Sequence, residues 1–295
     1  MRVLVTGSRG FVGTWLTRHL AGVGDEVLEL PAGLDVADRD AFVGAVAEAS
    51  PEWVCHLAGL ASVAGSWDDP AGTYLVNTLG VSHLCEAVLS CSPVPRVLLV
   101  SSAEVYGRVP ADELPIGEDR AFAPVSPYGA SKAAAELIGL QAWLGRGVQV
   151  VRARPFNHTG PGQRPDFVVP ALARQVAEAV AAGTGAISVG NLAARRDITD
   201  VRDVVRAYRL LLERGEPGVA YNVCRGESVA IGEVLQRLLF LSGADLRVEL
   251  DPGRLRPSDV PDLRGDPTRL EAATGWAPEV DLDRSLADVL AEWGA

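Results

Sequence analysis

Lysine is almost absent from this sequence. Lys132 is the one lysine among 27 basic residues, and all the others are arginine. Acidic residues outnumber basic ones by 38 to 27, which gives a formal charge of −11, and no basic run or stripe follows the chain. We therefore expect no nucleic acid partner. Any bound phosphate must be held by local arginine side chains or backbone N–H groups.

Long apolar runs and cysteine motifs are missing as well. No apolar run reaches membrane-spanning length and no signal peptide precedes the first strand-like run, so we expect a cytoplasmic protein without a membrane partner. The four histidines are scattered. The four cysteines form no C-x-x-C pair and have no metal-ligand spacing: Cys55, Cys85, Cys91 and Cys224. We expect buried structural thiols rather than a disulfide or zinc site.

Short apolar runs alternate with amphipathic stretches in the first half of the chain, which predicts a doubly wound parallel sheet. The expected buried strands are Val3–Val5, Val27–Leu30, Trp53–Leu57, Val97–Val100 and Val148–Ala153. The expected helices are Phe11–Ala21, Arg39–Ala49, Thr73–Leu89 and Ser131–Leu144. The fold class is therefore α/β, a Rossmann sheet with a smaller C-terminal α/β substrate lobe.

After residue 155 the pattern loosens into Pro- and Gly-rich segments. Helix patterns return at Val201–Leu212 and Val229–Leu241, with a strand-like run at 220–224 between them. We expect residues 1–155 to form the dinucleotide-binding domain, with 197–223 returning to it. Residues 156–196 and 224–295 would then form the lobe that binds a nucleotide sugar.

The first strand is followed directly by "VTGSRGFVGTWL", in which Gly7, Gly10 and Gly13 have a G-x-x-G-x-x-G spacing. Glycine lets the backbone turn sharply and approach a pyrophosphate, and the helix that follows offers free N–H groups. A plain glycine-rich turn is the alternative, but the strand before and the helix after it favour a dinucleotide.

The choice of dinucleotide is less defined. NAD enzymes place an acid at the end of the second strand, where this chain has Pro31, and Glu29 is expected to lie inside the strand. Arg9 in the glycine turn suits a 2′-phosphate, so the sequence leans slightly to NADPH over NADH. Asp35 is a candidate for the adenine edge, and an N-cap of the next helix is an equal alternative.

Tyr128 and Lys132 stand at i and i+4 at the start of a helical pattern, so their side chains are expected to share one face. A free tyrosine phenol has a pKa of about 10. A nearby ammonium is expected to lower that pKa and permit proton transfer at neutral pH. A chance surface pair is the alternative, but a composition that otherwise excludes lysine argues against it.

Ser101 and Ser102 stand at the carboxyl end of a predicted strand, within "VLLVSSAEVYG" (97–107). A hydroxyl there can hydrogen-bond a substrate carbonyl as charge develops on it. Two turn serines are the alternative.

The glycine turn, Ser-Ser before V-Y-G, and Y-x-x-x-K occur in this order, and together the sequence resembles the extended short-chain dehydrogenase/reductase family. "HLAGLASVAGSW" (56–67) and Asn77 are similar to that family's cofactor-side segments. The resemblance implies a catalytic triad of Ser102, Tyr128 and Lys132. It implies cofactor contacts at Gly7, Arg9, Gly10, Phe11, Val12, Gly13, Asp35, Val36, Leu57, Ala58, Gly59, Asn77, Tyr128 and Lys132.

The second half resembles the branch of GDP-mannose 4,6-dehydratases and GDP-4-keto-6-deoxymannose reductases. The segments that carry this resemblance are "ARPFNHTGPGQ" (153–163), "VGNLAARRDITDVRDVVRAY" (189–208), "YNVC" (221–224) and "RLRPSDVPDLRGD" (254–266). It implies that Asn157, Arg196 and Arg256 hold the nucleotide-sugar diphosphate, and that Val168 is a further substrate-binding residue. Guanidinium groups match phosphate oxygens, and an exposed ion pair is the alternative for Arg196.

Dehydratases of this branch use a Thr followed by Asp or Ser and then Glu, whereas this chain has Ser102, Ala103 and Glu104. Ala103 cannot exchange a proton, which favours a reductase. Glu104 is a candidate acid/base residue, and a remnant, a substrate ligand or a solvated charge are its alternatives.

We therefore expect an NAD(P)H-dependent 4-ketoreductase that converts GDP-4-keto-6-deoxy-D-mannose to GDP-D-rhamnose or its C4 epimer. A dehydratase or epimerase that holds its nicotinamide tightly is the alternative enzyme, and a catalytically silent nucleotide-binding regulator is the alternative from another class. The family resemblance also implies a homodimer through helices near 73–90 and 130–144.

Overall fold

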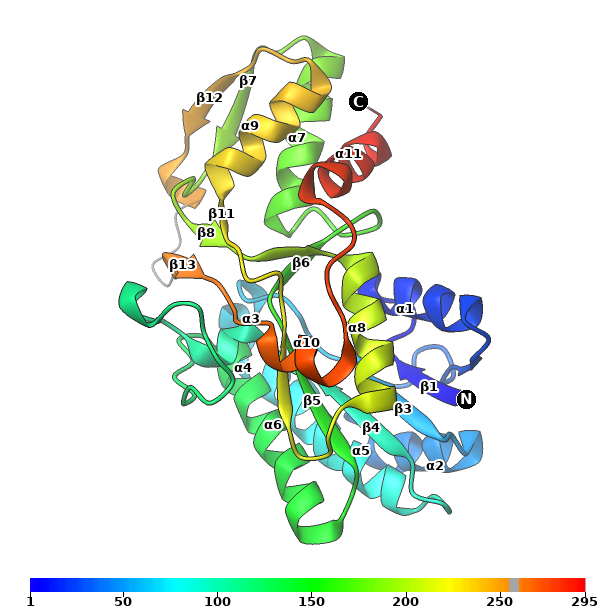
Figure 1. The fold of residues 1–295 in the computed structure, drawn as a ribbon. Coiled ribbons are helices and arrows are strands. Elements are labelled where there is room, and N and C mark those ends of the chain that lie inside the picture. Colours follow the sequence, from blue (N-terminus) through cyan, green and yellow to red (C-terminus); the bar gives the residue numbers. More distant parts are fainter. Residues whose placement is uncertain (255–259, 295) are drawn as a thin grey trace.

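A six-stranded parallel sheet forms the lower part of the computed structural model, which describes residues 1–254 and 260–294 (Figure 1). The strand order is β10-β5-β4-β3-β1-β2, so the direction of winding reverses between β1 and β3. The strands are β1 (Arg2–Thr6), β2 (Glu26–Leu28), β3 (Trp53–His56), β4 (Arg96–Val100), β5 (Val150–Pro155) and β10 (Ala220–Val223). This arrangement confirms the predicted α/β class. Ligands of such sheets bind at the carboxyl ends of the strands, near the reversal.

Helices cover both faces of the sheet, because alternate strand residues point to opposite sides. Val3 and Val5 pack under α1 and α8, whereas Leu4 packs under α2, α5 and α6. The helices are α1 (Phe11–Gly22), α2 (Arg39–Ala49), α5 (Gly80–Leu89), α6 (Pro127–Arg146) and α8 (Val201–Arg214). In Figure 1, α8 and α1 stand together on the right of the sheet, and their contact is direct.

Two predicted helices differ most at their bounds, and the predicted helix Val229–Leu241 begins only at Ile231, after β11. The predicted helix Thr73–Leu89 is three consecutive pieces: α4 (Pro70–Tyr74), a π-helical turn η1 (Leu75–Leu79) and α5. The predicted helix from Ser131 begins instead at Pro127, because Ser126 caps it by accepting a hydrogen bond from the Gly129 N–H at 3.1 Å. A serine cap followed by proline at the first position is a strong helix start.

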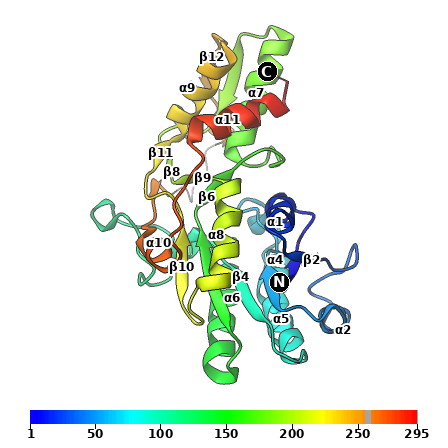
Figure 2. The ribbon, with the colours of Figure 1, turned by 45° about the vertical axis from the view of Figure 1, so that its right-hand side comes forward.

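The smaller lobe stands above the sheet, as Figure 2 shows from a second side. Its separate core is built from apolar side chains of α7, α9 and α11. The elements of this lobe are α7 (Val168–Ala182), β7 (Ala186–Val189), β8 (Arg195–Arg196), β11 (Val229–Ala230), α9 (Ile231–Ser242), β12 (Arg247–Leu250), β13 (Asp262–Leu263) and α11 (Leu282–Glu292).

Two connections tie the lobe to the sheet. A parallel pair, β6 (Asn157–Thr159) with β9 (Ile198–Asp200), lies between the two parts. Helix α10 (Thr268–Thr274) packs against α8 and β10, so it lies on the Rossmann side although it belongs to the predicted lobe range 224–295. Within the described residues, no helix has the length and apolar character needed to cross a bilayer.

Candidate functional site

The glycine turn lies between β1 and α1, at the carboxyl edge of the sheet. Gly7 has φ +74°, and a Cβ there would lie 2.9 Å from the Ala58 nitrogen. A Cβ at Gly13 would lie 2.1 Å from the Gly7 carbonyl oxygen. Larger residues are therefore excluded at both positions, since atoms cannot approach so closely.

The N-terminus of α1 is free to accept an anion. Its N-cap is Gly10, which supplies no side-chain hydrogen bond, and the first turn carries no acidic residue. A Cβ at Gly10 would meet only the Gly7 carbonyl oxygen within 4 Å, at 3.3 Å, so the space beyond is open. Free N–H groups at a helix N-terminus suit a pyrophosphate. The residues present therefore fit a dinucleotide.

The other residues predicted around this turn have mixed environments. Arg9 is exposed, while Phe11 and Val12 are half-buried. The Phe11 ring stacks on the His158 ring, with centroids 6.1 Å apart and planes 9° from parallel. Val36 is buried beneath α5, where a Cβ at Gly80 would lie 2.9 Å from its Cγ2 atom.

Two acidic residues near the second strand are placed differently from the predictions. Asp35 does not cap α2; its carboxylate accepts a hydrogen bond from the Ala37 N–H at 2.9 Å, and Asp38 caps the helix instead. Glu29 does not lie inside the strand, because β2 ends at Leu28 and Glu29 follows it as an exposed residue. Both acids are thus accessible at the edge where an adenosine ribose is expected.

The side chain of Asn77 is hydrogen-bonded within the protein rather than exposed to a cofactor. It is buried; its side-chain oxygen accepts from the Leu60 N–H at 2.8 Å, and its amide hydrogens go to the Leu60 carbonyl and the Ser131 hydroxyl, each at 3.0 Å. A Cβ at Gly59 would lie 2.8 Å from that side-chain oxygen. Asn77 therefore fixes the segment after β3, with Leu57, Ala58 and Gly59, against α6.

The three residues of the predicted catalytic set are all buried. Ser102, Tyr128 and Lys132 are 8%, 8% and 9% exposed. Ser102 lies two residues after β4 and caps the 3-10 turn η2 (Ala103–Tyr106), where its hydroxyl accepts a hydrogen bond from the Glu104 N–H at 3.2 Å. The Lys132 ammonium donates to the carbonyl oxygen of Val100 at 3.0 Å.

The expected lowering of the Tyr128 pKa is not observed. Burial raises the pKa of Tyr128 to about 12, the Ser102 hydroxyl counteracts this through a hydrogen bond, and the Glu104 carboxylate adds to the rise. Burial lowers the pKa of Lys132 to about 8, against the opposing charge of Glu136. The phenol therefore carries its proton at neutral pH, as a proton donor must.

Ala103 lies between Ser102 and Glu104 and is 1% exposed. It packs in an apolar cluster with Val105 and Tyr106. The side chain of Glu104 is near enough to Tyr128 to raise the phenol pKa. The Glu104 carboxylate is therefore the acidic group that η2 places near Tyr128.

The predicted substrate-binding residues that the structure describes lie on separate elements, with Asn157 and Arg196 on strands of two different sheets. Asn157 is half-buried on β6, opposite Ile198 of β9. Arg196 precedes β9 on β8, and its guanidinium donates to the carbonyl oxygens of Arg195 and Val260 at 2.8 and 2.7 Å. Val168 begins α7 and is 38% exposed. Arg256 lies outside the described residues.

Two polar residues at this edge, Ser66 and His56, were not singled out from the sequence, whereas Ser101 was. The buried Ser66 hydroxyl accepts the Tyr128 N–H at 3.1 Å. His56 bonds Thr6 through Nδ1 at 2.9 Å, and burial together with the Lys132 charge lowers its pKa to about 3. The Ser101 hydroxyl is buried without a hydrogen-bond partner among the described residues. The available signal was position: His56 ends β3, Ser66 lies in the 56–67 segment after it, and Ser101 directly follows β4.

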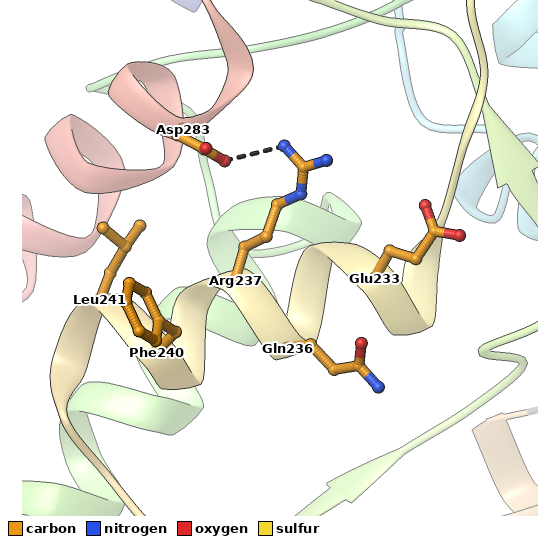
Figure 3. A pocket seen from close by; sticks show the side chains of 6 residues that line it. All are labelled: Glu233, Gln236, Arg237, Phe240, Leu241 and Asp283. Carbon is orange, nitrogen blue, oxygen red and sulfur yellow. Dashed lines mark hydrogen bonds and ion pairs between the residues drawn. The ribbon is translucent and has the colours of Figure 1, made fainter.

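The remaining candidates lie elsewhere or are inert. Burial raises the pKa of Cys55 and Cys224, and all four cysteines are free thiols. Within residues 1–254 and 260–294, no group of His, Cys, Asp or Glu has the makeup of a metal site. A surface pocket on α9 and α11 has Phe240 at one end and the Arg237–Asp283 ion pair beside it, and contains none of the site residues (Figure 3).

Comparison with known proteins agrees with this geometry. The family model described as GDP-mannose 4,6 dehydratase matches residues 31–289. The chain belongs to the GDP-mannose 4,6-dehydratase family. The predicted resemblance to this branch of the extended short-chain dehydrogenase/reductases is therefore confirmed.

Family relatives match nearly the whole chain. A GDP-6-deoxy-D-mannose reductase of Pseudomonas aeruginosa is 38% identical over 99% of this chain and 97% of its own. The solved structure of RMD from Pseudomonas aeruginosa complexed with NADPH has a TM-score of 0.93 at 38% identity, covering 99% of this chain and 98% of that one. A Thermus thermophilus UDP-glucose 4-epimerase complex with NAD has a TM-score of 0.89 at 31% identity, covering 100% of both.

Proposed function

We propose that the protein catalyses the NAD(P)H-dependent reduction of the C4 ketone of a nucleotide-activated 4-keto-6-deoxyhexose. The proposed substrate is GDP-4-keto-6-deoxy-D-mannose and the product GDP-D-rhamnose. The observation that carries the proposal is the buried Ser102–Tyr128–Lys132 set at the carboxyl edge of the sheet. The relative of 38% identity named as a GDP-6-deoxy-D-mannose reductase supports the same activity.

The chemistry follows from the protonation states of these groups. A reduced nicotinamide supplies a hydride to sugar C4. Tyr128, whose pKa of about 12 keeps the phenol protonated, transfers its proton to the carbonyl oxygen and becomes a phenolate. The Ser102 hydroxyl donates a hydrogen bond to that oxygen. Lys132 supplies a positive charge to the phenolate, which takes a proton from solvent before the next turnover.

The segment around Ala103 argues against the dehydratase alternative. Removing water across C5 and C6 of the sugar needs an acid and a base at adjacent positions, and a methyl group exchanges no proton. Ala103 is buried among apolar side chains and offers no group that could exchange a proton. Glu104 alone would have to perform both proton transfers.

Turnover assays separate these alternatives. Purified protein is mixed with NADPH or NADH and the GDP-, dTDP- or UDP-linked 4-keto sugar, and the absorbance of the reduced nicotinamide is followed. We expect the absorbance to fall with the GDP sugar and GDP-rhamnose to form. If the absorbance stays constant while GDP-mannose alone is dehydrated, the reductase assignment is wrong. A preparation that retains oxidised cofactor through purification would favour an epimerase or dehydratase.

We favour NADPH over NADH, because Arg9 is exposed in the glycine turn, where a 2′-phosphate can reach it. Glu29, now placed directly after β2, is the competing feature, since a carboxylate there suits a free ribose hydroxyl. Arg9→Ala is expected to lower kcat/KM for NADPH more than for NADH, and Glu29→Ala is the control that should not. Equal losses for both cofactors would remove Arg9 from this role.

We also propose a cytoplasmic homodimer whose interface involves η1 and α6. These two elements pack against each other and carry exposed apolar side chains. The exposed apolar side chains are Leu75, Leu79, Leu137 and Leu144, with exposures of 45%, 48%, 57% and 74%. Adjacent exposed leucines are typical of a surface that a partner covers. The solution mass from light scattering tests the proposal.

A further inference from the structure

A buried ion pair lies one helical turn beyond Lys132. Glu136 is 0% exposed on α6, and its carboxylate accepts from Arg154 Nε at 2.8 Å and from Arg154 Nη2 at 2.9 Å. Arg154 belongs to β5 and is 3% exposed. Arg152 adds a weaker contact to the same carboxylate at 3.3 Å. The pair therefore joins the helix of Tyr128 and Lys132 to the sheet.

The other end of Arg154 reaches the segment that starts with Ser102. Its Nη1 atom donates to the Tyr106 hydroxyl and to the Glu118 carbonyl, both at 2.8 Å. Tyr106 is the last residue of η2, and its hydroxyl donates to the Asn222 side-chain oxygen at 2.7 Å. One guanidinium thus contacts both segments of the proposed catalytic set.

Stability alone does not account for this arrangement. Burying two charges costs much of what their attraction returns, and an apolar pair of similar size is often as stable or more so. The bidentate geometry and the continued contacts to Tyr106 instead give the two segments a fixed relative position. A requirement for precise placement of Ser102 against Tyr128 explains why this site holds charges.

Lys132 has few charged groups around it. Glu136 acts on it from α6 and His56 lies within reach of its charge on β3, while Glu104 of η2 lies near Tyr128. Burial keeps His56 neutral by lowering its pKa to about 3. Glu136 is therefore the negative charge that opposes the desolvation of the ammonium, and it raises the pKa of Lys132.

We propose that Glu136 and Arg154 are positioning residues, whose ion pair fixes the Tyr128–Lys132 turn against the Ser102 segment and provides Lys132 with a buried counter-charge. The inference rests on the proposed reductase function for its kinetic consequence. The effect on Lys132 itself does not depend on that function.

The single lysine allows the counter-charge to be measured directly. Protein grown with lysine labelled at Cε gives one lysine NMR signal, whose titration reports the pKa of Lys132. In Glu136→Gln we expect this pKa to fall, by about one unit, because the opposing charge is lost and Arg154 is no longer neutralised. Asp203→Asn is the control, since Asp203 is an equally buried carboxylate paired with Arg206 on α8.

The positioning role is tested by a milder variant. Tyr106→Phe removes the hydroxyl that links Arg154 to η2 and leaves every charge in place. We expect kcat to fall by about tenfold, with KM for the nucleotide sugar within roughly twofold of wild type. Tyr221→Phe is the matched control. Tyr221 is a buried tyrosine on the edge strand β10, and the substitution removes one hydrogen bond, which its hydroxyl accepts from the Glu216 N–H.

The outcomes are separable. An unchanged pKa of Lys132 in folded Glu136→Gln overturns the counter-charge, and an unchanged kcat in Tyr106→Phe overturns the positioning role. If Glu136→Gln does not fold, Tyr106→Phe still decides the positioning role of the ion pair. If wild-type protein turns over none of the 4-keto sugars, the proposed function fails, while the titration still decides whether Glu136 acts on Lys132.

Discussion

Replacing Lys132 by methionine is expected to stabilise the protein at neutral pH while it abolishes turnover. Burial lowers the pKa of Lys132 from 10.5 to about 8, and such a difference disfavours the folded, charged form by about 3 kcal/mol. Methionine has a similar length and no charge. Losing the hydrogen bond to the Val100 carbonyl costs about 1 kcal/mol. We therefore expect the free energy of unfolding to rise by about 2 kcal/mol in total.

The gain must depend on pH. Because the folded pKa of Lys132 lies below its unfolded pKa, the unfolded chain binds more protons between about pH 8 and 10.5, and wild-type stability rises through this window. The advantage of Lys132→Met is therefore complete below about pH 8 and disappears towards pH 10.5. Urea unfolding followed by circular dichroism at neutral and alkaline pH measures both values.

The control for this experiment is an exposed cation on another helix. Arg174→Met removes a 41%-exposed cation of α7 that pairs with Glu178, and its effect should stay within about 0.5 kcal/mol at every pH. Turnover of Lys132→Met is expected to fall by at least about a hundredfold. A variant less stable than wild type at neutral pH, or a stability difference that does not change with pH, would refute the reasoning.

Three further changes test the cofactor turn, the proton donor and the interface. Tyr128→Phe should lower kcat by about a thousandfold while fluorescence titration still detects NADPH binding; retained turnover would remove Tyr128 from its role. Gly13→Ala places a Cβ 2.1 Å from the Gly7 oxygen, so we expect a loss of about 1–3 kcal/mol or more in thermal or urea unfolding and weaker NADPH binding than in Gly22→Ala, where the Cβ meets nothing within 4 Å. Leu79→Arg combined with Leu137→Arg should convert a dimer to a monomer in sedimentation velocity; an unchanged mass would place the interface elsewhere.

The sheet and its helices could be predicted because their signal is local. Buried parallel strands are short continuous apolar runs, and the helices between them repeat every three to four residues. The predicted bounds failed where a specific contact decides. The start of α6 at Pro127 depends on the Ser126 cap, and the π-helical turn at Leu75–Leu79 places Asn77 inward, where it brackets Leu60 and Ser131.

The candidate site was predictable in composition but not in electrostatics. Motif order brought Ser102, Tyr128 and Lys132 to one edge, since the ends of parallel strands meet there. The sequence carries no measure of burial, so the direction of the Tyr128 pKa was predicted wrongly. Likewise "LDVAD" holds two acids, and only the backbone geometry assigns the helix cap to Asp38 rather than Asp35.

The single lysine of the chain now has a physical explanation. Arginine serves at the other basic positions, whereas position 132 holds its cation in a confined space: the ammonium is 3.0 Å from the Val100 carbonyl oxygen and would lie 3.6 Å from a Cβ at Gly59. A guanidinium is broader, remains charged at any accessible pH and directs its hydrogen atoms in a fixed fork. The ammonium is compact, and its pKa of about 8 leaves it charged at neutral pH yet close to release of its proton. Both the size and the pKa of the cation therefore favour lysine over arginine at position 132 for the proposed proton transfer.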